Sequence, residues 1–252
     1  MAQEEKKGLA NLLSESFTLF VGHIHKFLTI SLLVYTPLSI VYVALFSDVN
    51  MQAIVQSRGA NLPEYFFLRL GIYFLFGIFS AIFYQLVIIK AIQSVDRREE
   101  KGIDVLVKEA VPSTGGFFKL TILILFKIFL WTLLFIIPGI VFSVFYALAN
   151  MAYVVDGQKG KSALILSKRL VEPNFFKFVG YSLVVMLLTI PFSWMSYLVI
   201  GGLLGTKANS AGLLPTLGEA LINLFTVILS GFSMTVFYFL YKEFKKISGA
   251  VI

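Results

Sequence analysis

Few side chains in this sequence are suited to chemistry. His23 and His25 are the only histidines, and there is no cysteine. Residues two apart on a helix point about 200° apart around its axis, so these imidazoles do not converge on a metal ion. Gly160-Lys161-Ser162 matches the end of a phosphate-binding loop, but Val155 occupies the position of the earlier glycine that such a loop requires. The sequence therefore predicts no catalytic residue, no metal ligand and no cofactor, and we expect the protein not to be an enzyme.

The remaining polar candidates lie inside apolar stretches. Lys127 interrupts the apolar sequence from 120 to 155. A charge within a membrane is costly and commonly functional, so Lys127 is a candidate contact for an anionic substrate or a buried acidic partner. The alternative is that its long side chain carries the ammonium to the membrane surface. Asn150 and Gln85 are uncharged polar residues able to form bonds between helices, and with Lys127 they define a candidate intramembrane polar site.

Membrane-spanning helices must position these side chains. Of the 252 residues, 58% are apolar and 14% are charged, whereas soluble domains have about 45–50% and about 25%. Runs without Asp, Glu, Lys or Arg cover 27–47, 70–89, 128–155, 178–206 and 220–241. Because about 20 helical residues cross the hydrocarbon of a bilayer, each run is long enough for a span. An ordinary soluble domain is excluded.

Pro138 and Gly139 divide the third run. The 36 residues from 120 to 155 can form two short spans that turn back at this pair, and a single helix kinked at Pro138 is the alternative. Two spans place 17 of the 21 Lys and Arg in cytoplasmic segments, three outside and Lys127 within a span. This satisfies the tendency of basic loops to remain in the cytoplasm. We therefore predict a multi-pass protein of the inner or plasma membrane with both termini in the cytoplasm.

The predicted fold is an all-α integral membrane bundle of six transmembrane helices, arranged as three hairpins in a single domain over 1–252. Spans are expected at about 27–46, 68–90, 119–137, 140–156, 177–199 and 218–241, and short cytoplasmic amphipathic helices at about 8–22, 102–111 and 161–172. The apolar stripes of these short helices either lie in the headgroup layer or pack against the spans. Pro37 and Pro191 are candidate helix breaks around a cavity, although proline also occurs in membrane helices for packing reasons.

A lysine follows an apolar residue and a ring at the start of each outward-going span. These residues, Lys26, Lys119 and Lys177, are expected to be interfacial basic anchors. The shared pattern indicates either three copies of one unit or independent anchoring of three spans. Since the cations behind the net charge of +7 are divided among the inner segments, we expect anionic membrane lipid rather than nucleic acid as their partner. A protein partner or a homo-oligomer is a further possibility.

The stretch from 137 to 170 resembles the membrane domain of glycerophosphoryl diester phosphodiesterases and the related YciC-like membrane proteins. The matching features are Ile137-Pro138-Gly139-Ile140, the Val154-Val155-Asp156-Gly157 end of the next span, and Ala163-Leu164 followed by Ser167 and Leu170. In those phosphodiesterases hydrolysis belongs to a separate barrel domain, to which nothing in this sequence corresponds. The resemblance thus implies the membrane part alone. We expect a membrane scaffold or accessory protein; the alternative is a transporter or permease for a lipid-like or small anionic solute.

Overall fold

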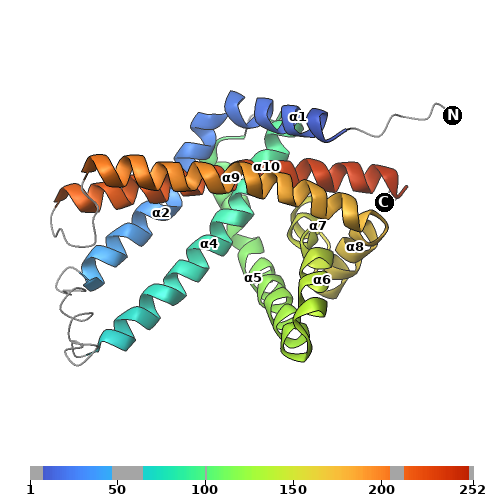
Figure 1. Cartoon of the computed structure of the whole chain (residues 1–252), viewed down its shortest axis with the longest axis horizontal. Coiled ribbons are helices and arrows are strands. Elements are labelled where there is room, and N and C mark those ends of the chain that lie inside the picture. Colours follow the sequence, from blue (N-terminus) through green and yellow to red (C-terminus); the bar gives the residue numbers. More distant parts are fainter. Residues whose placement is uncertain (1–7, 47–64, 100, 205–212, 250–252) are drawn as a thin grey trace.

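The computed structural model describes residues 8–46, 65–99, 101–204 and 213–249 (Figure 1). All regular elements in these ranges are helices. Their bounds are Leu9–Gly22 (α1), Ile24–Phe46 (α2), Phe66–Asp96 (α4), Ile103–Leu134 (α5), Ile136–Tyr146 (α6), Ala149–Asp156 (α7), Lys161–Val171 (α8), the 3-10 turn Glu172–Asn174 (η1), Phe175–Leu204 (α9) and Leu213–Ile247 (α10).

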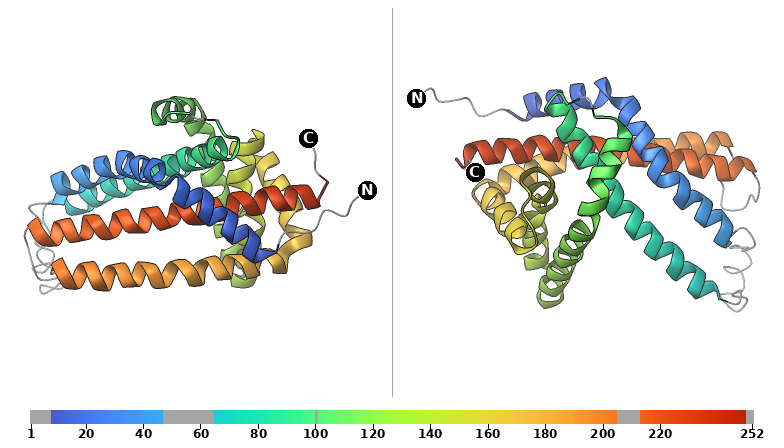
Figure 2. Two further views of the ribbon diagram at one scale, coloured as in Figure 1. Left: turned by 90° about the horizontal axis from the view of Figure 1, so that it is seen from above. Right: turned by 180° about the vertical axis from the view of Figure 1, so that it is seen from behind.

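Three helix hairpins diverge from one shared end of the molecule (Figure 1). The helix α2 pairs with α4, α5 with α6, and α9 with α10. The shared end, called the junction below, consists of α1, α7, α8 and the C-terminal ends of α4 and α10. There α1 crosses over α10 (Figure 2). The predicted all-α fold with three hairpins is confirmed.

The lengths and composition of the helices fit a membrane protein. Five described helical segments are long and apolar enough to cross a membrane, and a sixth is obtained when α1 and α2, which meet at a bend of 70°, count as one. At the far ends of the hairpins large apolar side chains face outward, with Leu133 at 72% and Ile137 at 76% exposure. Such surfaces require hydrocarbon around them. The predicted count of six spans approximately fits.

The buried core is concentrated at the junction. Most side chains that are at most 1% exposed come from α1, from the C-terminal half of α4, from α7 and α8, and from the end of α10, and others come from the start of α2 and the first half of α5. They include Leu12, Leu86, Ile92, Ala152, Leu170, Tyr241 and Phe244. The junction therefore holds the hairpins together, while their outer halves rely on the surrounding lipid.

The turn between α5 and α6 lies at Phe135, three residues before the predicted turn at Pro138 and Gly139. Phe135 has an extended backbone, with φ −156° and ψ 135°. Pro138 falls in the first turn of α6, where a missing N–H leaves no intrahelical bond unmade. Gly139 is buried against Thr132, whose Cα would lie 2.8 Å from a Cβ at that position. The glycine is thus required for the close approach of the two helices.

Proline does not end the helix at three positions inside α5, α2 and α9. The segment 102–111 and the span at 119–137 are not separate, because α5 continues through Pro112. Two residues later, the Thr114 Oγ1 donates to the carbonyl of Ala110 at 3.0 Å. Likewise, α2 continues through Pro37 and α9 through Pro191. The predicted fourth span, 140–156, lies within Ile136–Asp156, a segment long and apolar enough to cross a membrane, with a short interruption at 147–148 between α6 and α7.

The short amphipathic helices use their apolar stripes mainly for packing. Leu12 on α1 and Leu166 on α8 are buried at the junction. Of the two roles left open by the sequence, packing against the spans therefore accounts for most of each stripe. Phe17, which belongs to the stripe of α1, is 58% exposed, and Ile165 on α8 is 59% exposed.

Candidate functional site at the junction

The end of α4 is bound to α10 by a cluster of polar side chains. Asp96, the last residue of α4, accepts a hydrogen bond of 2.8 Å from the Tyr238 hydroxyl and an ion pair of 2.7 Å from the Lys242 ammonium. Tyr238 and Lys242 are four residues apart on α10, so they lie on one helix face. These contacts link α4, the second helix of the first hairpin, directly to α10, the second helix of the last hairpin.

The end of α7 is bound to α10 in the same manner. Asp156 accepts hydrogen bonds from the Tyr241 hydroxyl at 2.5 Å and from the Lys245 ammonium at 2.8 Å. Sequence reasoning placed Asp156 at a span end but missed this network. Two repeated patterns in the sequence could have indicated the network. A Tyr and a Lys four residues apart occur twice in the last span, and each of two inward-going spans ends in Asp.

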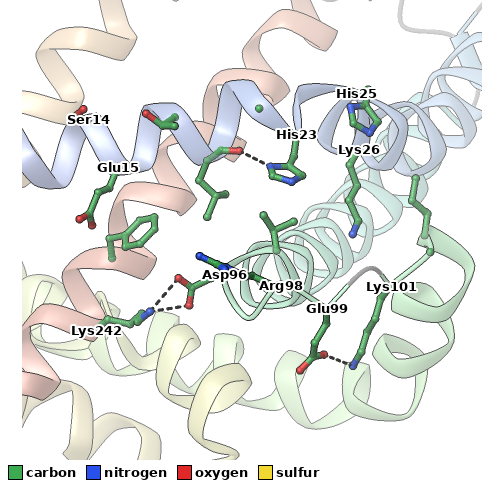
Figure 3. A pocket seen from close by; sticks show the side chains of 17 residues that line it. Ser14, Glu15, His23, His25, Lys26, Asp96, Arg98, Glu99, Lys101 and Lys242 are labelled. Atoms are coloured by element: carbon green, nitrogen blue, oxygen red, sulfur yellow. Dashed lines mark hydrogen bonds and ion pairs between the residues drawn. The ribbon is translucent and has the colours of Figure 1, made fainter.

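A polar cavity of about 1290 Å³ opens beside the first of these clusters (Figure 3). It lies between α1, the start of α2, the end of α4 and the connection to α5. His23, His25, Lys26, Arg98, Lys101 and Lys242 line it together with Glu15, Asp96 and Glu99. Two histidines and four other basic side chains thus face three carboxylates, which leaves the lining net basic.

Several of these charges already have defined partners. Asp96 is paired with Lys242, and Glu99 lies 3.1 Å from the Lys101 ammonium. Lys101 also contacts Glu109 at 3.0 Å, and its hydrogen bonds to Glu109 and Glu99 raise the pKa of Lys101 above its usual value. Two of the three lining carboxylates are therefore neutralised by lysines.

The structure brings two of the three predicted intramembrane polar residues together. Asn150 on α7 donates a hydrogen bond of 3.0 Å to the Gln85 carbonyl oxygen on α4, and the Gln85 amide lies 3.7 Å from the sulfur of Met234 on α10. Lys127 instead faces α6, with its ammonium 5.7 Å from the centre of the Tyr146 ring. The candidate site is thus a helix–helix contact plus a separate lysine–aromatic contact.

The three basic anchors occupy different environments. Lys26 lines the cavity, and its ammonium lies 3.5 Å from the Ser94 hydroxyl. Lys119 is exposed in the middle of α5, whereas the Lys177 ammonium lies 5.6 Å from the centre of the Tyr181 ring. The three units also differ at these points, with a bend before α2, a continuous α5 and a 3-10 turn before α9.

Comparison of the chain with protein-family models, with curated proteins and with solved structures finds no match. Within the described ranges, no three His, Asp or Glu side chains gather in a group able to hold a metal ion.

Proposed function

We propose that this multi-pass membrane protein is a scaffold or accessory protein, not itself an enzyme, that contacts anionic lipid headgroups through its junction. One observation supports this most: most of the core and the ion pairs of Asp96 and Asp156 lie at the junction, and the cavity opens beside it, while the outer halves expose apolar side chains. This distribution suits hairpins anchored in lipid that carry one working surface at the membrane edge. The abundance of basic residues near the junction favours a cytoplasmic location for it.

Exposed apolar side chains on the junction helices support a lipid contact. Phe17 on α1 and Ile165 on α8 are exposed, and α8 also carries the basic residues Lys161 and Arg169 on its exposed surface. Helices with apolar and basic residues of this kind enter the headgroup layer of anionic membranes.

A transporter or permease for a lipid-like or small anionic solute is the second candidate. The contact between Lys127 and the Tyr146 ring favours it, since a lysine ammonium inside a membrane segment is a candidate anion contact. Because α2 and α9 continue through Pro37 and Pro191, these prolines do not add support for this candidate.

Uptake by reconstituted vesicles separates the two candidates. Protein is placed in vesicles of phosphatidylcholine with phosphatidylglycerol, and uptake of inorganic phosphate and glycerol phosphate is measured. A scaffold leaves uptake equal to that of empty vesicles. Uptake that requires the protein and disappears in Lys127→Met overturns the scaffold proposal and supports the permease.

Site-directed cross-linking tests the proposed contact surface. A photoreactive amino acid at exposed Phe17 is expected to label phosphatidylglycerol, whereas the same group at buried Leu12 labels only the chain itself. In native membranes, a protein adduct at Phe17 without lipid adducts identifies a protein partner or a second copy and contradicts the proposed lipid contact.

We also propose that the chain belongs with the membrane parts of the glycerophosphoryl diester phosphodiesterases and YciC-like proteins. Two residues of the resembling motifs have specific roles that support this. Gly139 permits the approach of α6 to Thr132 on α5. The Ser167 hydroxyl of α8 bridges the break between α6 and α7 by donating to the Phe145 carbonyl and accepting from the Leu148 amide.

A further inference from the structure

We infer that the hairpin of α5 and α6 is a re-entrant membrane element, which enters the bilayer beside the junction and turns back inside the hydrocarbon without reaching the far surface. Its turn, residues 133–140, then lies among the acyl chains of lipids. By length and composition alone, Ile103–Leu134 and Ile136–Asp156 are each able to cross a membrane. The turn lies away from the junction, so its contact with hydrocarbon is independent of the headgroup contact proposed above.

The turn exposes a continuous apolar surface. Six large apolar side chains in it are each at least 60% exposed, namely Leu133, Leu134, Phe135, Ile136, Ile137 and Ile140. The sequence has no Asp, Glu, Lys or Arg between Lys127 and Asp156. A turn that emerged from the far surface would hold these apolar side chains in water, whereas a turn inside the bilayer holds them in hydrocarbon.

The other two hairpins have connections of a different composition. The sequence between α2 and α4 includes Asp48, Arg58 and Glu64, and the sequence between α9 and α10 includes Lys207. Charged residues favour the aqueous sides of a membrane over its interior. The uncharged sequence between α5 and α6 therefore sets this hairpin apart from the two whose connections suit the far surface.

A contact between three helices provides a common level from which the hairpins can be measured. Asn150 of α7 donates a hydrogen bond to Gln85 of α4, whose amide lies 3.7 Å from the sulfur of Met234 on α10. From this level α4 extends 19 residues to its outer end and α10 extends 21, whereas Asn150 is 14 residues from the start of α6. At about 1.5 Å per residue these lengths are about 29, 32 and 21 Å. Hydrocarbon about 30 Å thick is therefore matched by α4 and α10 but not by the α5–α6 hairpin.

The direction of the hairpin reduces its reach further. In Figure 1 the outer ends of α4, α9 and α10 lie toward the left, whereas the turn between α5 and α6 lies apart from them, and Figure 2 shows the same divergence. A bilayer that α4 and α10 cross is thus entered by α5 and α6 at a different inclination. A helix inclined to the membrane normal reaches a depth smaller than its own length.

The backbone of the turn is short, and its central residue is paired. Phe135 is the one residue between α5 and α6. Its amide donates to the Trp131 carbonyl at 3.0 Å, and its carbonyl accepts from the Gly139 amide at 3.2 Å. Pro138, in the first turn of α6, has no N–H to be satisfied. Since hydrocarbon offers no hydrogen-bond partner to the backbone, a turn of this kind suits it better than a longer loop.

The position of Lys127 distinguishes the two depths. Lys127 precedes Phe135 by eight residues on α5, which is about 12 Å. Because α5 runs outward from the junction and helix side chains lean toward the N-terminus, the ammonium leans back toward the junction. A turn at the far surface would place this charge near the middle of the hydrocarbon, where it is most costly. A turn inside the hydrocarbon brings the ammonium to the nearer headgroups, together with the Tyr146 ring 5.7 Å from it.

Depth-dependent quenching tests the inference. The chain has no cysteine, so a single introduced one can carry a bimane fluorophore. Ile137→Cys and Leu133→Cys report on the turn, while Tyr65→Cys at the outer end of α4 and Ser162→Cys at the junction are the controls; all four positions are exposed. Labelled proteins are placed in vesicles of phosphatidylcholine with phosphatidylglycerol that carry a nitroxide either at the headgroup or near the end of the acyl chain. Both leaflets contain the nitroxide, so the orientation of the protein does not affect the result.

We expect the acyl-chain nitroxide to quench Ile137→Cys and Leu133→Cys more strongly than the headgroup nitroxide does. The order should be reversed at both control positions. Stronger headgroup quenching at the two turn positions would place the turn at a membrane surface and overturn the inference. Quenching by neither nitroxide would mean that a protein partner or a second copy of the chain covers the turn, and this result also overturns it.

Access of water to the turn provides a second measurement. An impermeant maleimide is added to both faces of opened membranes. The thiol of Ile137→Cys should stay unlabelled until SDS is added, which confirms that the thiol is present, whereas that of Tyr65→Cys should react without SDS. Equal labelling rates at the two positions contradict a turn inside the hydrocarbon. The cross-linking test at Phe17 concerns the junction alone, so the two proposals can fail separately.

Discussion

The Lys245 ammonium of α10 lies 2.8 Å from the Asp156 carboxylate, which ends α7 and has a side chain only 8% exposed. The parallel pair of Lys242 and Asp96 is similarly short, at 2.7 Å, but both partners are more exposed, with Lys242 at 48% against 26% for Lys245 and Asp96 at 17% against 8% for Asp156. Because water screens exposed charges and an unpaired buried charge is costly, the two pairs contribute differently to stability.

Asp156→Asn is expected to destabilise the protein more than Asp96→Asn. The first change leaves the Lys245 ammonium without its anion in a mostly buried place and should cost about 2 kcal/mol, below the full cost of a wholly buried pair. The second should cost about 1 kcal/mol or less. Unfolding in mixed micelles with rising SDS, followed by circular dichroism, measures both. Equal costs would show that burial does not separate the pairs, and adding Lys245→Met to Asp156→Asn should recover part of the loss.

Gly139→Ala should weaken the α5–α6 hairpin. The new methyl group would collide with Thr132, including its backbone Cα at 2.8 Å, and overpacking of this kind costs about 1–3 kcal/mol. Thr132→Ala should rescue only part of the loss, since the Cα remains. The same unfolding titration applies. Gly77→Ala is the control, because open space surrounds the position of its Cβ; a matching loss there would point to a general effect of replacing helical glycines.

Ser167→Ala should loosen the break between α6 and α7. The fully buried hydroxyl bonds to the Phe145 carbonyl at 2.6 Å and to the Leu148 amide at 3.1 Å. Unsatisfied buried groups cost about 1–3 kcal/mol, and exchange of the Leu148 amide hydrogen should accelerate. Hydrogen exchange with mass spectrometry measures this. Exposed Ser162→Ala should leave exchange unchanged, and a Leu148 amide equally protected in Ser167→Ala would refute the role assigned to the hydroxyl.

The hairpins could be predicted because they depend on features that can be read from the sequence, namely the length of each apolar run and the summed charge of each loop. Charge-free runs report span length, and the distribution of lysines decided that 120–155 turns back on itself. The position of the turn was missed by three residues because proline was read as the turn itself. Proline is equally suited to the first turn of a helix, and Pro138 occupies that place.

The junction network was not predictable in the same way. Tyr238 and Asp96 are 142 residues apart in sequence, and which acid meets which tyrosine depends on how three hairpins pack. Periodicity identified the buried stripe of α8 but left open whether protein or lipid covers it. No local sequence pattern predicted the left-handed backbone of Arg98, because this conformation depends on how α4 ends.

Labelling of single cysteines tests the orientation on which the cytoplasmic assignment depends. The chain has no cysteine, so one can be introduced by Tyr65→Cys at the outer end of α4 or by Ser162→Cys at the junction. In sealed right-side-out cells an impermeant maleimide should label only the first, because positive residues surround the second. Ala10→Cys is the companion at the N-terminal side; labelling of residue 162 while residue 10 is protected would contradict the shared side of the junction.

Gly116 and Tyr153 should be coupled in their effects on stability. The Tyr153 hydroxyl donates to the Ser113 carbonyl at 3.0 Å, and it is the nearest atom that a Cβ on Gly116 would meet. Gly116→Ala must displace the tyrosine and should cost about 1–3 kcal/mol. In a Tyr153→Phe background the nearest remaining atom is the ring carbon at 3.3 Å, so the same change should cost less.

A double-mutant cycle measures this coupling, using the free energies of unfolding of both single variants and the double variant. Gly115→Ala is the matched control, because it lies one residue away on the same helix with nothing within 4 Å of its Cβ position. It should be neutral or stabilise by up to about 1 kcal/mol through helix propensity. A Gly116→Ala cost that is identical with Tyr153 and with Phe at 153 would mean that α7 does not approach α5 through this tyrosine. The tie between the second hairpin and the junction would then have to come from other contacts.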